Sequence, residues 1–135
     1  MATTIATALR AHLTSPEIPA LGVRVHLDAA PRGERFPYLV MIPILGKAVA
    51  LAGDARALAR REPVQVELWQ KVDDAGVGED DALERTIRER LDGARITSDE
   101  QSIRVRLVNV IRFPRETPDN VIRTIFDLLV THATS

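Results

Sequence analysis

Two segments of this chain alternate like β-strands, yet each carries large apolar side chains on both of its faces. In "VQVELWQKV", residues 64–72, the apolar residues Val64, Val66 and Leu68 share one face. The other face is polar except for Trp69, the only tryptophan of the chain. Because burying a large aromatic side chain stabilises by roughly 1.5–3 kcal/mol, we expect something to cover this indole.

The second such segment is "SIRVRLVNVIRF", residues 102–113. Strict alternation places on one face Ile103, Val105, Leu107, Ile111 and Phe113, and on the other Arg104, Arg106, Val108, Val110 and Arg112. The arginines admit three interpretations: a phosphate-contacting stripe, a solvated strand face, or a surface that pairs with acids of another subunit. No aromatic residue interleaves with them, which argues against a platform for single-stranded nucleic acid. The two valines imply partial burial and favour the third interpretation.

Contiguous apolar surface of this kind marks interaction sites, so the second face of the predicted sheet needs a cover. One candidate is another copy of the chain or another protein. The other is the long excursion predicted over residues 46–62, where Gly46 and Gly53 bracket an alanine-rich stretch and 54–62 could form two helical turns capped by Asp54. Both sources of cover remain open on the sequence alone.

The rest of the chain supplies helices and further strands. Helical periodicity predicts helices over residues 3–14 and 81–93, with Gly93 as the left-handed stop and Glu84 on the wet side of the second helix. Strands are predicted over 22–28 and 38–45, the latter apolar on both faces. Residues 121–132 fit a strand or a helix, and their β-branched residues favour the strand. We expect one domain, residues 1–135, of the α+β class: a mainly antiparallel sheet of about five strands, mixed if one connection crosses over, with two main helices packed on it.

Composition excludes several functions. A formal net charge of -1 makes a dedicated nucleic-acid binder a poor interpretation, and the absence of cysteine removes thiolate chemistry and Cys-based zinc sites. His12, His26 and His132 lack metal-ligand spacing, and no phosphate loop or serine-nucleophile motif is present. The acids at 73–81 do not have the spacing of a calcium loop and fit a solvated loop before a helix. We therefore expect no catalytic residue, no metal and no cofactor, and the polar N-terminus and lack of a long apolar run predict neither a signal peptide nor a membrane span.

The order and spacing of these segments resemble the tail terminator, or tail completion, proteins of long-tailed bacteriophages. The resemblance rests on a leading helix followed by "LGVRVHLDAAPRGERFPYLVMIPI", then "PVQVELWQK", "DDALERTIRERLDG" and "RLVNVIRFPRETPDNVIRTIFDLLVTHA". In the family, the final strand carries an arginine and an acid, which correspond here to Arg123 and Asp127. The stretch "GKAVALAGDARALA" has no counterpart that we can place.

The resemblance implies a structural protein with no enzyme activity. It implies a ring, typically hexameric, on the head-proximal end of the tail tube of the virion, assembled in the host cytoplasm. Its implied partners are other copies of the chain, the tail tube protein and a neck or head-completion protein; DNA passes through the lumen without specific binding, and no membrane is involved. The residues expected at subunit or partner interfaces are Trp69, Arg104, Arg106, Val108, Val110, Arg112, Arg115, Arg123 and Asp127.

Other functions remain open at this point. Within the same class, the chain could be a neck or head-closure component of the phage connector. From another class, it could be a small enzyme or a ligand-binding domain whose site has no recognised motif. A strictly monomeric chain at high concentration would weaken the ring interpretation.

Overall fold

The computed structural model describes residues 5–43, 49–50, 59–71, 82–98, 101–113 and 121–134. Its elements are α1 (Ile5–Thr14), β1 (Val25–Leu27), β2 (Tyr38–Pro43), β3 (Val49–Ala50), β4 (Ala59–Lys71), α2 (Ala82–Leu91), β5 (Arg95–Ser98), β6 (Gln101–Arg112) and β7 (Val121–Thr134). The α+β class is as expected from the sequence. The expected strand count is wrong, because the described residues form seven strands rather than about five.

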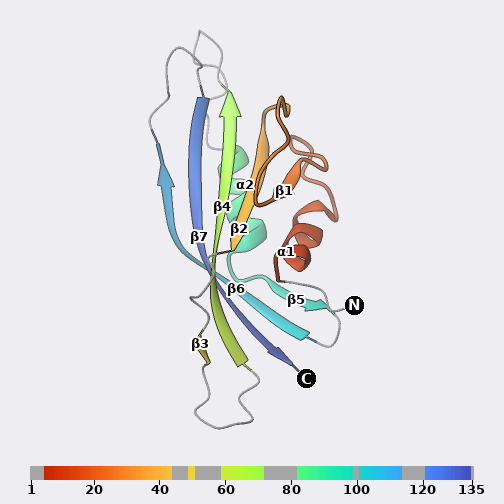
Figure 1. Ribbon diagram of the computed structural model, residues 1–135, viewed down its shortest axis with the longest axis vertical. Helices are drawn as coiled ribbons and strands as arrows, with labels where there is room; N and C mark the ends of the chain where they lie inside the picture. The colour runs from red at the N-terminus through yellow and green to blue at the C-terminus, as the bar shows by residue number, and fades with distance from the viewer. Residues whose placement is uncertain are drawn as a thin grey trace.

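The strands form a single strongly twisted sheet in the order β1-β2-β4-β7-β6-β5, with β3 paired to β4 (Figure 1). All neighbours are antiparallel except β1 and β2, which are parallel, so the sheet is mixed. The two short strands β3 and β5 account for the larger count. β4 begins at Ala59, so the helix considered for 54–62 is wrong over 59–62. The rest of the predicted excursion, residues 46–48 and 51–58, lies outside the described residues, and so does the end of the predicted strand, residues 44–45.

Both described helices pack on one face of the sheet, which we call the core face. Leu9 and Leu13 of α1 and Ile87 and Leu91 of α2 are fully buried there, against the inward-facing residues of the central strands such as Phe126. Burial of each such side chain stabilises the fold by roughly 1.5–3 kcal/mol. Each helix has ten residues and is too short and too polar to cross a membrane, and this holds for every helix within the described ranges.

Polar contacts fix the two helices to each other at the edge of this core. The Arg90 guanidinium donates to the carbonyls of His12, at 3.2 Å, and Pro16, at 2.9 Å. His12 Nε2 lies 2.8 Å from the carbonyl of Arg90. Gly93 follows α2 with a φ of 75°, which confirms the predicted left-handed stop.

The final segment is the strand β7, as its β-branched residues indicate. Its buried residues alternate strictly with half-buried ones, from Ile122 through Phe126 to Val130. A helix would have buried residues three or four positions apart rather than every second one. β7 lies between β4 and β6 and pairs with both along most of its length, which makes it the centre of the sheet.

A β-bulge in β6 corrects the face assignment made from the sequence. Leu107 pairs with Leu128 and Asn109 with Asp127, so Val108 is an extra residue without a partner in the ladder. One extra residue reverses the alternation beyond it. Val110 and Arg112 therefore lie on the core face, opposite Phe126 and Thr124. Ile111 and Phe113 lie on the other face, and the strict alternation predicted over 102–113 holds only up to Leu107.

The chain leaves β1 by a crossover rather than by a hairpin. Asp28 has a φ of 68°, a left-handed conformation that aspartate tolerates better than most residues. Residues 28–37 then return to the start of β2 so that β2 runs parallel to β1. This crossover, 28–37, passes over the face opposite the helices, which we call the outer face. It buries Val40, which is only 5% exposed although no helix covers it.

Candidate functional site

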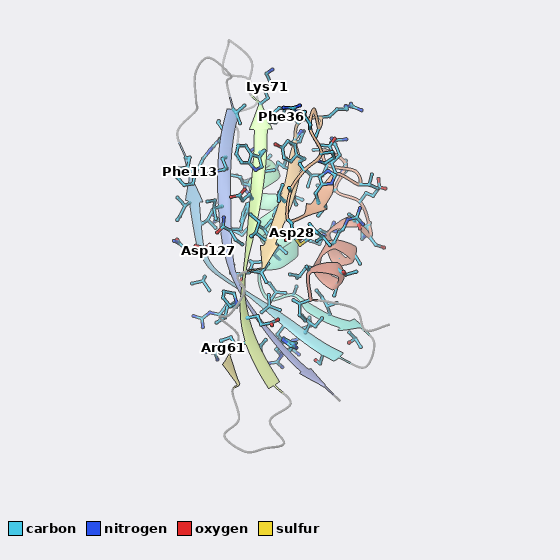
Figure 2. The ribbon with its side chains drawn as sticks, viewed as in Figure 1. Asp28, Phe36, Arg61, Lys71, Phe113 and Asp127 are labelled. Carbon is cyan, nitrogen blue, oxygen red and sulfur yellow. The ribbon has the colours of Figure 1, made fainter. Side chains whose placement is uncertain are left out.

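The outer face carries two groups of side chains, one aromatic and one basic, at opposite ends of the sheet. Figure 2 shows Phe36 and Phe113 toward one end of the molecule and Arg61 toward the other. Alternation along β2, β4 and β7 brings Tyr38, Trp69 and Arg123 to the aromatic end, because Trp69 pairs directly with both of the others. The two ends can therefore contact different surfaces.

At the aromatic end, Trp69 is half-buried between neighbours of its own chain. Its ring stacks on Tyr38 with centroids 6.3 Å apart and an interplanar angle of 16°. The Arg123 guanidinium lies over the indole on its other flank, 5.4 Å from the ring centroid, and over the Phe113 ring at 4.4 Å. Aromatic and cationic neighbours on β2 and β7 therefore shield part of the indole, a source of cover that was not expected from the sequence.

Glu67, on the same face, contacts both Trp69 and Arg123. It is 9% exposed, and its carboxylate accepts from Trp69 Nε1 at 3.3 Å and from the Gln65 amide at 3.0 Å. Arg123 Nη1 lies 3.9 Å from the same carboxylate. Burial and, after it, the negative charges of Glu34 and Glu67 raise the pKa of Tyr38 above its ordinary value of 10.0. The Tyr38 hydroxyl therefore stays neutral and available as a hydrogen-bond donor.

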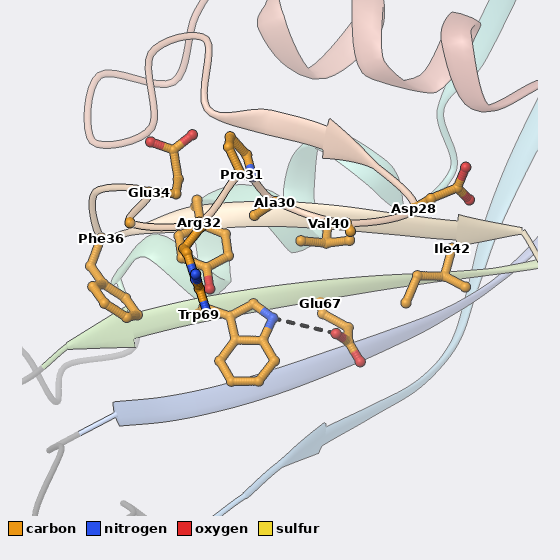
Figure 3. A pocket seen from close by; sticks show the side chains of 13 residues that line it. Asp28, Ala30, Pro31, Arg32, Glu34, Phe36, Val40, Ile42, Glu67 and Trp69 are labelled. Atoms are coloured by element: carbon orange, nitrogen blue, oxygen red, sulfur yellow. Dashed lines mark hydrogen bonds between the residues drawn. The ribbon is translucent and has the colours of Figure 1, made fainter.

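A cavity of about 490 Å³ lies between the crossover and the outer face. Figure 3 shows Phe36 and Arg32 on the crossover side and Trp69 and Glu67 on the sheet side. The crossover is held by Glu34, whose carboxylate pairs with His26 Nε2 of β1 and accepts from the Arg35 amide at 2.8 Å. The Arg35 amide contact and the pairing with His26 lower the pKa of Glu34 below its ordinary value of 4.5, although desolvation opposes them.

At the opposite end, the outer face carries exposed arginines. Arg104 and Arg106 point to this face, as the sequence predicts, and they line a second cavity of about 320 Å³. Arg61 of β4 and Arg95 of β5 join them there. Neither of these was expected at the site. Arg61 could have been placed on the outer face, because it lies an even number of positions away from Trp69 along β4. It was missed because this strand was predicted to begin at residue 64.

The remaining expected interface residues lie in different surroundings. Val108, at the bulge, is 59% exposed. Arg112 is on the core side, where its guanidinium lies 3.5 Å from the buried carboxylate of Glu84, which also accepts a hydrogen bond from Thr124. Glu84 is thus 7% exposed rather than on the wet side of its helix.

Asp127 and Arg115 complete the expected set. Asp127 is half-buried on the outer face and pairs with Gln65 and Asn109 on the neighbouring strands. It therefore lies between the aromatic and basic ends. Arg115 falls outside the described residues.

The chemistry of this face is that of a contact surface. Within the described ranges, no three His, Asp or Glu side chains gather in a way that could hold a metal ion. Exposed apolar residues such as Ile111, 41% exposed, stand beside the Arg123 guanidinium and half-buried aromatic rings. Aromatic and arginine side chains are the residue types enriched where proteins bind one another.

Comparisons with known proteins agree with this architecture. One solved structure, described as the virion of a native gene transfer agent particle, contains a chain with 17% sequence identity and a TM-score of 0.59, covering 93% of this chain and 85% of that one. A second solved chain has 19% identity and a TM-score of 0.62, covering 97% of this chain and 94% of that one. At these identities the likeness concerns the fold. No curated protein matches the chain.

The family comparison is more specific than these structural likenesses. The model of one family, described as Tail completion protein gp17, matches residues 7–129, from the first helix to the last strand. This match confirms the family expected from the order of the segments in the sequence. The chain belongs to the family of tail completion protein gp17.

Proposed function

We propose that this protein forms a ring, a hexamer, on the head-proximal end of a phage tail tube. There it ends the addition of tube subunits and presents the surface on which the neck docks. Membership of the tail completion family gives the chain a structural role in a phage tail and makes it a virion component. Ring formation, position and partners are what we add to that role.

The observation that carries the proposal is the uncovered outer face. Among the described residues, no helix packs on it, and only the crossover covers part of its aromatic end. A head-to-tail ring uses two different patches of each subunit, and the aromatic and basic ends supply two such patches. Nine interface residues were expected from the sequence. Of those that the structure describes, all except Val110 and Arg112 lie on the outer face or at the bulge of β6.

We propose further that the chain is a single domain without catalytic activity and that the lumen of the ring does not bind DNA specifically. The partners are other copies of the chain, the tail tube protein and a neck or head-completion protein. DNA crosses the ring without specific binding. The near balance of 18 basic and 19 acidic residues supports this, because strongly cationic walls would retain DNA through counterion release.

The test is tail assembly in cells that lack the protein. We expect tubes of uncontrolled length without attached heads in electron micrographs, and normal tails once the wild-type chain is supplied. Tubes of normal length that fail to join heads would place the protein in the neck and overturn the terminator role. Normal tails joined to heads would exclude both.

A further inference from the structure

The second half of β6 lies at an edge of the sheet. β5 pairs with β6 only over residues 101–104, and beyond Leu107 no described strand lies beside β6 on the side opposite β7. The unpaired N–H and C=O groups of such an edge are a template on which a strand of another molecule can add. The partners of these N–H groups therefore decide whether the sheet can continue into a second molecule.

Up to the bulge, the N–H groups that point away from β7 have partners within the chain. The Val105 N–H donates to the Ala94 carbonyl at 2.9 Å, just before β5 begins. The Leu107 N–H donates to the carboxylate of Asp92, with Oδ1 at 3.1 Å. A side chain thus takes the place of a neighbouring strand at the point where β5 no longer accompanies β6.

Beyond the bulge, the donor at the edge is the N–H of Val110. The Phe113 N–H donates to the Arg123 carbonyl of β7 at 2.8 Å, and the direction of the backbone groups alternates along a strand. The N–H of Val110, three residues earlier, therefore points away from β7. It donates to Oδ1 of Asn109 at 3.0 Å. The side chain of the preceding residue thus occupies the donor that an added strand would need.

The bulge at Val108 acts in the same direction. Val108 has no partner on β7, because Leu107 and Asn109 pair with consecutive residues of that strand. A bulge bends its strand and increases the local twist, and bulges are among the features by which natural sheets prevent pairing at their edges. The bulge and the Asn109 side chain are adjacent, so they interrupt the same part of the edge.

The backbone at the opposite edge of the sheet, β1, is also occupied by its own chain. Arg10 Nε of α1 donates to the Val25 carbonyl at 2.7 Å, and the Val25 N–H donates to the Val23 carbonyl at 2.8 Å. The Leu27 carbonyl accepts from the Ala29 N–H at 2.8 Å. β1 has only three residues, and short edge strands are a further means of avoiding strand addition. The same kind of protection is therefore present at two edges of the described sheet.

We propose that Asn109 and the bulge at Val108 cap the edge of β6 against strand addition, so that copies of this chain meet through their outer faces and do not continue the sheet. The outer face supplies the alternative contact, because it retains exposed apolar residues such as Ile111. The statement about the outer face rests on the proposed ring, whereas the capping of the edge does not.

Removing both features tests the capping. Asn109→Val in a chain that lacks Val108 has neither the side-chain acceptor nor the extra residue, and valine favours strands. We expect this double variant to fold, as far-ultraviolet circular dichroism shows, and to form species of several-fold larger average mass than the wild type at equal concentration in light scattering. Asn109→Val alone, which keeps the bulge, should show a smaller increase.

Hydrogen exchange of the Val110 amide separates strand addition from non-specific adhesion. In Asn109→Val this N–H has lost its acceptor, so in dilute solution it should exchange faster than in the wild type. As the concentration rises, a strand of a second copy becomes the acceptor, and exchange should slow several-fold. In the wild type the exchange of Val110 should not follow concentration in this way.

Two control variants define the cause. Glu89→Val places the same apolar side chain on the exposed side of α2, and it should leave both the mass and the exchange of Val110 unchanged. Asn109→Lys also loses the acceptor, but it puts a charge on the edge, which is another common block to strand addition. Its Val110 amide should exchange fast at every concentration, and its mass should not exceed that of the wild type.

A double variant that folds but keeps the mass of the wild type, with exchange of Val110 independent of concentration, would overturn the proposal. If the double variant does not fold, the same measurements on Asn109→Val decide. Equal growth in mass of Glu89→Val would also overturn it, because the lost cap would not be the cause. Normal tails in cells that lack the protein would remove the ring, but these measurements on the purified chain would still decide the capping.

Discussion

Trp69 shows at the scale of one residue how the outer face is partly completed within the chain. Trp69→Ala removes the ring that stacks on Tyr38 and over which the Arg123 guanidinium lies. We expect a loss of about 1–2 kcal/mol in the free energy of unfolding, less than the roughly 3–5 kcal/mol typical of a fully buried aromatic residue, because this indole is half-buried. Denaturant unfolding measures it. Trp69→Phe, which keeps a ring in place, should lose less. A wild-type emission spectrum typical of free indole would contradict the packing.

Glu84 is a residue whose role the sequence pattern hides. It occupies the first turn of α2, where an acid is favoured, but its carboxylate is buried against Thr124 and Arg112 of the sheet. Glu84→Ala should lower the free energy of unfolding by about 2–3 kcal/mol, because the buried Thr124 hydroxyl loses its acceptor and the helix loses its ion pair with the sheet. Glu89→Ala, on the exposed side of the same helix, should change it by less than about 0.5 kcal/mol. Equal losses in chemical denaturation would show that Glu84 does not fasten the helix.

The bulge in β6 is a property of a whole strand. Deleting Val108 leaves the pairs Leu107–Leu128 and Asn109–Asp127 adjacent and restores a regular ladder. We expect this deletion to fold with nearly unchanged stability. Deleting Val110 instead moves Ile111 and Phe113 to the core face and should destabilise strongly, because one missing residue exchanges the faces of all that follow. Thermal unfolding of the two deletions measures the difference, and equal destabilisation would refute the bulge at this position.

The crossover 28–37 is the element that responds to acid. The pKa of Glu34 is lower in the folded chain than its ordinary 4.5, so its contacts with the Arg35 amide and with His26 stabilise the fold above that pH. This contribution is lost as the pH falls through the lower, folded value. We expect a carbon-13 NMR titration of the Glu34 carboxyl to have its midpoint below 4.5. Trp69 lines the same cavity, so its fluorescence should change in step, and Glu34→Gln should remove that change. A midpoint at or above 4.5 would contradict the contacts of Glu34 with the Arg35 amide and His26.

The strands show which parts of the fold can be predicted from sequence. β7 and the second half of β4 have long alternating patterns and were predictable. β3 and β5, of two and four residues, are too short to leave a periodic signal. The bulge is concealed because Val108 is itself apolar, so the pattern reads as continuous. The parallel pairing of β1 and β2 depends on the path of the crossover, which local sequence does not specify.

For the candidate site, sequence located individual side chains better than their groupings. Trp69, Arg104, Arg106 and Arg123 were expected at subunit or partner interfaces, and the structure places all four on the outer face. Their division into an aromatic and a basic end depends on which residues of distant strands are paired. Such pairing depends on the order of the strands in the sheet, which cannot be predicted from the local patterns of a single sequence.

At the scale of the whole molecule, the two faces of the sheet have different requirements. The core face is satisfied within the chain by the helices, as the complete burial of residues such as Leu68 and Phe126 shows. The outer face retains large apolar groups in contact with water, and this makes assembly favourable. Substitutions on it should therefore affect assembly more than folding.

Two exposed apolar residues separate these effects. Ile111 is 41% exposed on the outer face, and Val23 is 60% exposed ahead of β1, where its carbonyl accepts from Arg10 of α1 at 3.5 Å. We expect Ile111→Asp to fold, with a change of less than about 1 kcal/mol in the free energy of unfolding, but to fail in ring assembly and in restoring tail length to cells that lack the protein. A charge placed in a packed contact is left desolvated and unpaired, which explains the loss. Val23→Asp should assemble normally. If both variants assembled as the wild type does in light scattering and in complementation, the outer face would not be the subunit contact; if both failed, the effect would not be specific to it.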